Sequence, residues 1–221
     1  MPSKSRTTRI LLADEREIVR RGLQQILTES LRGAAYGEAS SPGEIIRSLQ
    51  ESRWSLVILD ALFPSRSGLE VLKDIRRLRP ALPVLMISSY NDEQLAVRAL
   101  RAGASGYLPR QTKSKEIVAA VRKVIAGGRY VTSSLAERLA LEIQSGAASV
   151  PHERLSDREF QVFKLLAAGL TVKRVAERLH LSAQTVSTHR ARLLDKMKME
   201  TNADLVRHAA QHHLLDEGYG P

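Results

Sequence analysis

Between residues 8 and 126, short apolar runs alternate with longer stretches in which apolar residues recur at helical spacing. The runs at 10–13, 56–59 and 84–87 are continuously apolar, as strands buried on both faces of a sheet should be, and weaker strands are expected at 34–36 and 106–108. The stretches between them predict amphipathic helices. Five such strand–helix units joined by short connections predict an α/β fold with a doubly wound, five-stranded parallel sheet.

Two helix starts in this region carry clear capping signals. Ser41 is followed by Pro42 and, three residues after the serine, by Glu44, which is the order of an N-cap, a first-turn proline and a capping-box acid. Ser67 and Glu70 repeat the box without the proline. We therefore expect helices to begin at both places.

After Gly127 and Gly128, which end the fifth predicted helix, the pattern becomes entirely helical. A helix is expected around 133–144, followed by a linker at 145–151. Ser156, Thr171, Ser182 and Asn202 each suit the N-cap of a short helix, the last helix reaching about residue 214. We predict an α/β domain at 8–126, a partly helical linker at 127–151 and an all-α four-helix domain at 152–216.

Composition narrows the function classes. The 221 residues are 43% hydrophobic and 26% charged, which is typical of a folded globular protein. Cysteine is absent, which excludes a disulfide framework, a thiolate zinc site and a cysteine nucleophile. No apolar run approaches the roughly 20 residues of a membrane span, and the N-terminus lacks the core of a signal peptide. We expect a cytoplasmic protein with no membrane partner.

Positive charge is concentrated near the end of the chain. The formal net charge is +10, and a basic balance favours a polyanionic partner. In the segment 171–198, seven lysines and arginines stand against Glu177 and Asp195, a local net charge of +5. This local excess indicates nucleic acid more strongly than the total does.

Polar side chains follow the predicted strands of the α/β domain. Asp14 and Glu15 come after the first strand, Asp60 after the third and Ser88 after the fourth. Since the carboxyl ends of parallel strands form the ligand-binding edge, these groups should lie together, although a single strand-end aspartate is more often a helix cap. Crowded carboxylates suit Mg²⁺, and Asp60 is then placed to attack a phosphoryl group.

With these residues in view, 8–126 resembles the receiver domain of bacterial two-component response regulators, which has a flavodoxin-like (CheY-like) fold. The matching motifs are 12–15 (LADE), 60–64 (DALFP) with Gly68, Ser88, 99–104 (ALRAGA) and 106–108 (GYL). The resemblance implies that Asp60 is the phospho-acceptor and that Asp14, Glu15, Asp60 and the backbone carbonyl of Leu62 hold Mg²⁺. It also implies that Ser88 and Tyr107 form the switch.

One position departs from the receiver pattern. Receivers carry a lysine after the fifth strand, and here that position is Arg110, preceded by Pro109. Arginine keeps the charge but is longer, planar and forked, so the exchange is not conservative. Arg66, in the loop after Asp60, is a second basic residue near the expected pocket, although a solvated loop arginine is the simpler interpretation.

Residues 152–216 resemble the LuxR-type (NarL/FixJ-like) helix-turn-helix. The match runs through 155–159 (LSDRE), 165–169 (LLAAG), 175–179 (VAERL), 185–186 (TV), 189–190 (HR) and 193–197 (LLDKM). The helix after Ser182 is the predicted recognition helix, which would read bases in the major groove of double-stranded DNA and grip phosphates with flanking cations. The expected DNA-binding residues are Lys173, Gln184, Thr185, Ser187, Thr188, Arg190, Ala191, Arg192 and Lys196.

The histidines are expected to be structural or superficial. His189 should face the domain rather than the DNA. His208, His212 and His213 are spaced along the last helix without further metal ligands in the sequence, so we expect ordinary surface histidines.

Three functions are weighed. The first is a DNA-binding transcriptional regulator activated when a sensor histidine kinase phosphorylates Asp60, forming a homodimer through a seam around Leu205, Ala209 and Ala210, and catalysing only its own modification. The alternative is a phosphate-independent regulator whose receiver serves dimerisation or docking. The third, a Mg²⁺-dependent phosphatase, lacks the general acid that aspartyl phosphatases carry two residues after the nucleophile, where Leu62 stands.

Overall fold

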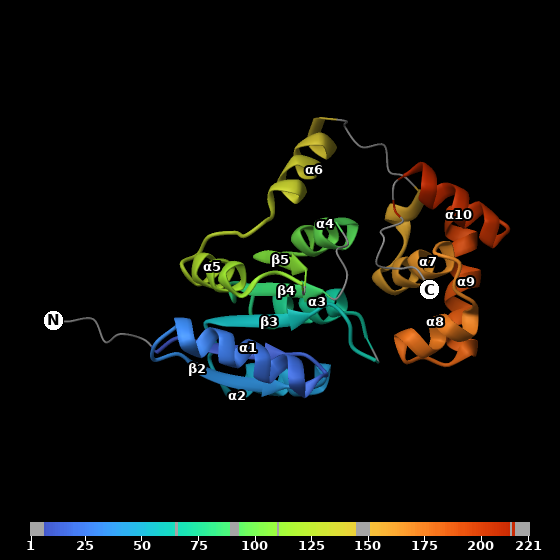
Figure 1. The fold of residues 1–221 in the computed structure, drawn as a ribbon. Helices are drawn as coiled ribbons and strands as arrows, with labels where there is room; N and C mark the ends of the chain where they lie inside the picture. The colour runs from blue at the N-terminus through green and yellow to red at the C-terminus, as the bar shows by residue number, and fades with distance from the viewer. Residues whose placement is uncertain are drawn as a thin grey trace.

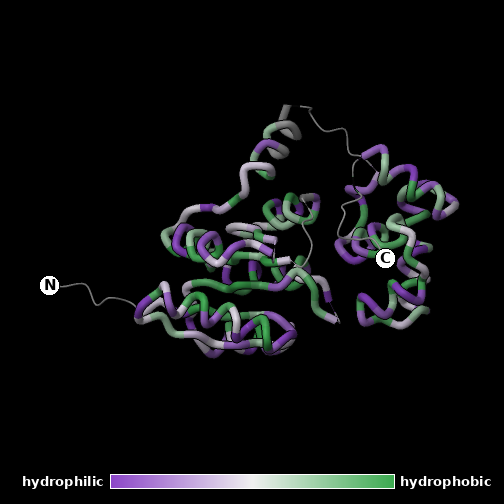
Figure 2. Tube along the Cα trace, in the orientation of Figure 1, coloured by the Kyte–Doolittle hydropathy of each residue, from purple (hydrophilic) through white to green (hydrophobic). Residues whose placement is uncertain are grey.

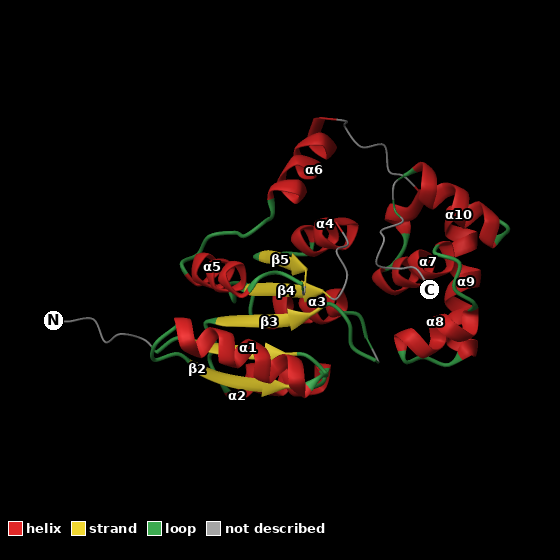
Figure 3. Cartoon of the chain, in the orientation of Figure 1, coloured by secondary structure: helices red, strands yellow, loops and turns green. Residues whose placement is uncertain are grey.

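The computed structural model describes residues 7–64, 66–88, 93–109, 111–144, 151–212 and 214. These residues form an α/β unit followed by an all-helical unit (Figures 1 and 3). The strands are β1 (Arg9–Ala13), β2 (Ala35–Ala39), β3 (Leu56–Asp60), β4 (Val84–Ser88) and β5 (Gly106–Pro109). The helices of the α/β unit are α1 (Glu17–Ser30), α2 (Pro42–Glu51), α3 (Gly68–Leu78), α4 (Glu93–Arg101) and α5 (Ser114–Ile125). They are followed by α6 (Ser133–Gln144), η1 (Pro151–Arg154), α7 (Asp157–Ala167), α8 (Val172–Leu179), α9 (Ala183–Met197) and α10 (Asn202–Gln211).

The sheet confirms the predicted doubly wound topology. Its strands are parallel and lie in the order β2-β1-β3-β4-β5. Every residue of β3 and β4 is buried, as their unbroken apolar sequences require, and Figure 2 shows these central strands as largely hydrophobic. One core cluster joins the sheet to α2, α3 and α4, and the other joins it to α1 and α5. The carboxyl ends of β1, β3 and β4 therefore meet at one edge.

Several local predictions need correction. β2 spans Ala35–Ala39 rather than 34–36, extending in register with the whole of β1. Ser41 caps α2 by accepting from the Glu44 N–H, but the Glu44 carboxylate binds the N–H and hydroxyl of Ser40 instead of closing the box. The last helix is capped by Thr201, not Asn202, because Thr201 and Asp204 form a reciprocal box. The box of Ser67 and Glu70 is confirmed.

The all-helical unit has its own core. Phe160 and Phe163 of α7 pack at 5.9 Å between ring centroids, and apolar residues of α8, α9 and α10 complete the cluster. His180 and Lys198 end α8 and α9 in the left-handed conformation, with φ of 52° and 56°. Among the described residues, no helix combines the length and apolar character that crossing a bilayer requires.

The two units are joined by polar contacts from α3 and α4 to η1 and α7. The Arg98 guanidinium of α4 donates to the carbonyls of His152 at 2.7 Å and Leu155 at 3.0 Å. Lys73 of α3 pairs with Asp157 at 2.8 Å. Leu62, in the loop after β3, packs against the helical core. The α/β unit thus contacts η1 and α7, the first elements of the helical unit. Helix α9 lies on the side of the helical unit that faces away from the α/β unit (Figure 1).

Candidate functional site

The predicted strand-end residues meet at the carboxyl edge of the sheet. Asp14 directly follows β1, Asp60 is the last residue of β3 and Ser88 is the last residue of β4. All three are buried, with 3%, 4% and 0% of their surfaces exposed. Two carboxylates enclosed in this way cannot both hold a full charge without compensation.

The electrostatics of Asp60 reflect this crowding. Burial, followed by the negative charge of Asp14, raises the pKa of the Asp60 carboxyl from 3.8 to about 8. The positive charge of Arg16 and the backbone N–H groups of Ala61 and Leu62 act in the opposite direction. Cationic charge in the pocket therefore decides whether the Asp60 carboxyl is ionised near neutral pH.

Arg16 is a pocket residue that the sequence analysis did not identify. Its guanidinium lies 3.4 Å from an oxygen of Asp14 and 3.7 Å from an oxygen of Asp60. Its backbone N–H also donates to Asp14 at 2.9 Å. The signal in the sequence was a basic residue immediately after the Asp14–Glu15 pair, at the N-cap of α1, where the chain leaves the functional edge of the sheet.

The expected cluster of three carboxylates is not formed in this structure. Glu15 is exposed on the turn into α1, and the described residues contain no group of three acidic or histidine side chains close enough to hold a metal ion. Asp14 and Asp60 remain together, with the backbone of Leu62 beside them. Buried carboxylate and carbonyl oxygens in this number suit Mg²⁺, which keeps several waters as ligands.

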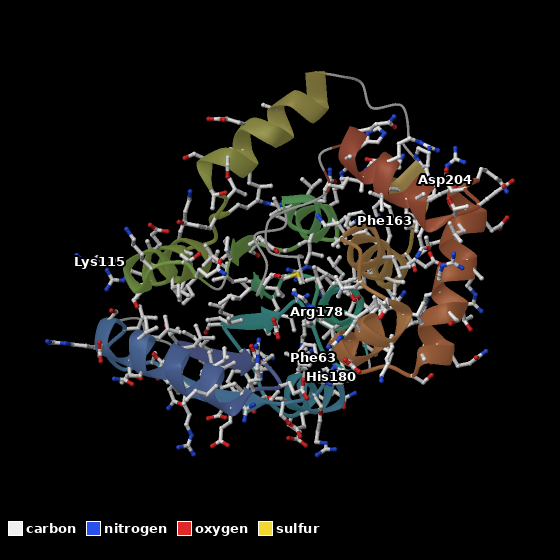
Figure 4. The ribbon with its side chains drawn as sticks, turned by 45° about the vertical axis from the view of Figure 1, so that its right-hand side comes forward. Phe63, Lys115, Phe163, Arg178, His180 and Asp204 are labelled. Atoms are coloured by element: carbon white, nitrogen blue, oxygen red, sulfur yellow. The ribbon has the colours of Figure 1, made fainter. Side chains whose placement is uncertain are left out.

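Asp60 opens into a pocket of about 450 Å³ between the two units. The α/β unit contributes Arg16, Leu62 and Phe63, and the helical unit contributes Arg178 and His180 from the end of α8. Figure 4 shows the labelled side chains of Phe63, Arg178 and His180 gathered where the units face each other. The pocket therefore brings Arg178 of the helical unit to the same opening as Asp60.

The predicted switch residues are both enclosed. Ser88 is 0% exposed and Tyr107 of β5 is 3% exposed, within the core cluster that covers α2, α3 and α4. Arg110 lies outside the described residues. Arg66 does not line the pocket; it pairs with Asp74 at 2.7 Å, which supports its interpretation as a loop arginine.

The predicted recognition helix is α9, and its outward face is open. Gln184, Ser187, Thr188, Ala191 and Arg192 are exposed even with the α/β unit docked, and so is Lys173 at the start of α8. Thr185 is half-buried and shares a hydrogen bond with the N-cap Ser182. The inward residues Val186, Leu193 and Leu194 bind α9 to the core.

Two of the predicted DNA contacts are tied into the domain. Arg190 donates to Asn202 at 2.7 Å, and Lys196 pairs with the buried carboxylate of Glu159 at 2.6 Å. The Lys196 bond helps to hold the pKa of Glu159 below its usual value, although burial acts against this. His189 is half-buried and its pKa is lowered mainly by burial, in keeping with the expected structural role.

The last helix differs from expectation in two respects. His208 is buried rather than superficial, and its ring bonds His152 of η1 at 3.0 Å; His213 lies outside the described residues. Leu205 and Ala209 are completely buried in the core of their own domain, so they are not available as a dimer seam. The apolar stripe that suggested a seam packs instead against α7, while Ala210 is exposed.

Comparisons with known proteins cover nearly the whole chain. Residues 10–122 match the family "Response regulator receiver domain", and residues 153–209 match "Bacterial regulatory proteins, luxR family". The chain is 31% identical to the response regulator UvrY of Escherichia coli over 94% of this chain and 95% of that one. It is 36% identical to the transcriptional activator protein ExaE of Pseudomonas putida over 93% and 97%.

Among solved structures, the chain is similar to RcsB from Salmonella enterica serovar Typhimurium bound to promoter rprA with phosphomimetic BeF₃⁻, with a TM-score of 0.61 and 22% identity. The alignment covers 93% of this chain and 99% of RcsB. At this identity the likeness establishes the fold of both units.

Proposed function

Because the chain belongs to the two-component response regulators with a receiver domain and a LuxR-type DNA-binding domain, we propose that phosphorylation of Asp60 controls its activity as a transcription regulator. The family consists of DNA-binding transcription regulators rather than enzymes, so we reject the hypothesis of a Mg²⁺-dependent phosphatase. The family also gives no support to a receiver that works without phosphate. One observation carries the proposal: a buried carboxylate beside a second carboxylate, open to a pocket at the carboxyl edge of the sheet.

The chemistry is a phosphoryl transfer. A carboxylate oxygen of Asp60 forms a bond to phosphorus while the P–N bond of a phosphohistidine on the sensor kinase, or the P–O bond of a small acyl phosphate, breaks. The leaving group departs with the electron pair. Ser88, at the end of the neighbouring strand, is the proposed donor of a hydrogen bond to the transferred group.

Asp14, Glu15, Asp60 and the backbone carbonyl of Leu62 are the residues that would hold Mg²⁺. Bound Mg²⁺ supplies positive charge to the phosphoryl oxygens. Arg16 lines the same pocket, and Arg110 is the proposed counterpart of the lysine found in other receivers. Tyr107, buried in the adjacent strand β5, is the proposed responder to a shift of Ser88.

We assign DNA recognition to α9. Gln184, Ser187, Thr188 and Ala191 present amide, hydroxyl and methyl groups that have partners on base edges in the major groove. Phosphate contacts fall to the cations Lys173, Arg190, Arg192 and Lys196, together with Thr185 at the positive end of the helix.

The active form is proposed to be a cytoplasmic homodimer on paired half-sites. Since Leu205 and Ala209 are committed to the core, the outward face of α10 is the surface that remains for a second copy. It carries Val206, which is 40% exposed, and Ala210.

The test is labelling of the full chain by acetyl phosphate with and without Mg²⁺, followed by intact mass. We expect one phosphoryl adduct that requires Mg²⁺ and is absent from Asp60→Asn. DNA binding and sedimentation of the same samples should then change with labelling in the wild-type protein alone. An adduct that persists in Asp60→Asn, or DNA binding that ignores a complete adduct, would contradict the proposal.

A further inference from the structure

Arg16 occupies the space between the two buried carboxylates. The guanidinium is within 3.4 Å of Asp14 and 3.7 Å of Asp60, so the same side chain faces both groups. The arginine side chain is 49% exposed, whereas the two carboxylate side chains are 5% and 3% exposed. The guanidinium therefore faces one oxygen of each carboxylate, where it competes with any divalent ion that binds those oxygens.

We propose that Arg16 is a built-in counter-ion that competes with Mg²⁺ for Asp14 and Asp60 and thereby lowers the metal affinity of the resting protein. The inference rests on the proposed function in that it takes the same pocket to be the Mg²⁺ site. It adds a specificity-determining residue that sets how much Mg²⁺ the pocket requires.

The competition follows from the chemistry of the two cations. Mg²⁺ needs carboxylate lone pairs directed at it in near-octahedral geometry, and a guanidinium N–H uses those same lone pairs. Two cations cannot share a pair of buried carboxylates at contact distance without strong repulsion. Binding of Mg²⁺ thus requires withdrawal of the Arg16 side chain.

The local structure permits that withdrawal. The backbone N–H of Arg16 bonds Asp14 at 2.9 Å independently of the guanidinium, so the loop and the Asp14 carboxylate stay in place when the side chain leaves. The side chain projects into the pocket of about 450 Å³, which gives it room to move. A substitution at Arg16 therefore removes the competing charge while leaving the acidic ligands oriented.

Isothermal titration of the full chain with MgCl₂ tests the inference, because it reads metal binding without phosphorylation. Arg16→Gln is expected to bind Mg²⁺ about three- to tenfold more tightly than the wild-type protein, since two partly exposed ion pairs no longer oppose the metal. Arg21→Gln is the matched control. Arg21 is 73% exposed on α1, pairs with Glu17 one turn earlier in the same helix, and loses the same unit of charge. Its affinity should stay within about twofold of wild type.

Asp60→Asn locates the binding, and it should weaken Mg²⁺ affinity in both the wild-type and Arg16→Gln backgrounds. Unchanged or weaker binding by Arg16→Gln, or equal tightening by Arg21→Gln, would overturn the inference while leaving the Mg²⁺ site of the proposed function intact. If neither the wild-type protein nor Arg16→Gln binds Mg²⁺, or if Asp60→Asn binds it equally well, the proposed metal site fails and the inference fails with it.

Discussion

The guanidinium of Arg98 lies over the ring of Phe160, with its Cζ atom 4.0 Å from the ring centroid. Arg98 belongs to α4 of the receiver, and Phe160 belongs to α7 of the DNA-binding domain. The same guanidinium donates to the carbonyls of His152 and Leu155. Its flat face therefore stacks on an aromatic ring of the DNA-binding domain while its N–H groups form hydrogen bonds to that domain's backbone. Helix α4, which packs against β5 of the receiver, is thereby coupled to the DNA-binding domain.

Replacing Arg98 with alanine should loosen this joint. The variant leaves the two carbonyls without their charged donor and removes the cation–π contact, so we expect the free energy of unfolding to fall by about 1–3 kcal/mol in urea denaturation followed by circular dichroism. Arg77→Ala is the control. Arg77 is 79% exposed and pairs with Asp74 within its own helix, so its loss should cost less than about 0.5 kcal/mol. Equal losses in the two variants would mean that Arg98 does not hold the domains together.

Gly68 provides a second prediction, because it lets α3 begin in close contact with the backbone of Asp60, the proposed phospho-acceptor. A Cβ atom at this position would collide with the backbone carbonyl of Asp60 and with the backbone of Ala61. Gly68→Ala should therefore destabilise the protein by about 1–3 kcal/mol and reduce acetyl phosphate labelling of Asp60, as seen by intact mass.

Gly22→Ala is the matched control for this substitution. Gly22 lies inside α1, and an added Cβ atom there would meet nothing beyond the backbone of its own helix within 4 Å. Alanine should therefore stabilise the protein by about 0.4–1 kcal/mol and leave labelling unchanged. If Gly68→Ala behaves like Gly22→Ala, the close contact between Gly68 and the backbone of Asp60 matters neither for stability nor for labelling.

The sequence predicted those features that depend on local pattern. Three strands could be placed from continuous apolar runs, and the positions of Asp14, Asp60 and Ser88 followed from the rule that strand ends share an edge. The helix caps at Ser67, Ser156 and Thr171 were readable because a cap and its partner lie within three residues.

Features that depend on distant partners could not be read in this way. In the sequence, Arg98 is indistinguishable from any other helical arginine, and its role becomes visible only from its contact with α7. His208 was expected at the surface because its partner His152 lies 56 residues away in the sequence. The stripe of Leu205 and Ala209 fits a dimer seam and a core face equally well, and the packing of α7 decides between them. Arg16 escaped notice because its role depends on the convergence of two strands.

The buried histidine pair gives a pH-dependent prediction. Burial, and secondly the charge of His212, lower the pKa of His208 from its usual 6.5. The unfolded chain therefore binds this proton more readily than the folded protein, so His208 permits full stability above about pH 6.5 and destabilises the fold as the pH falls below that value. Around it lie His152, His212, Phe163 and, through His152, Phe160.

Urea denaturation of wild-type protein and His208→Gln at several values between pH 5 and pH 8 checks this expectation. The wild-type free energy of unfolding should fall more steeply toward pH 5 than that of the variant, because glutamine cannot take up the proton. Parallel pH profiles would show that His208 is readily protonated in the folded protein.

The exposed residues near α9 should divide into those that read sequence and those that only hold DNA. Gln184 carries an amide suited to paired hydrogen bonds with adenine, so Gln184→Ala should cost about 1–3 kcal/mol at one base pair of a site selected by the wild-type protein, and relax the preference there. Lys173→Ala should weaken binding to all DNA sequences equally. It should also reduce by about 1 the slope of the logarithm of the binding constant against the logarithm of the salt concentration.

Lys196→Met should act differently, lowering the free energy of unfolding by about 1–2 kcal/mol, because Lys196 pairs with the buried Glu159 carboxylate at 2.6 Å. Fluorescence anisotropy at several salt concentrations, with urea denaturation alongside, separates these effects, and a base-specific loss in Lys173→Ala would contradict the division.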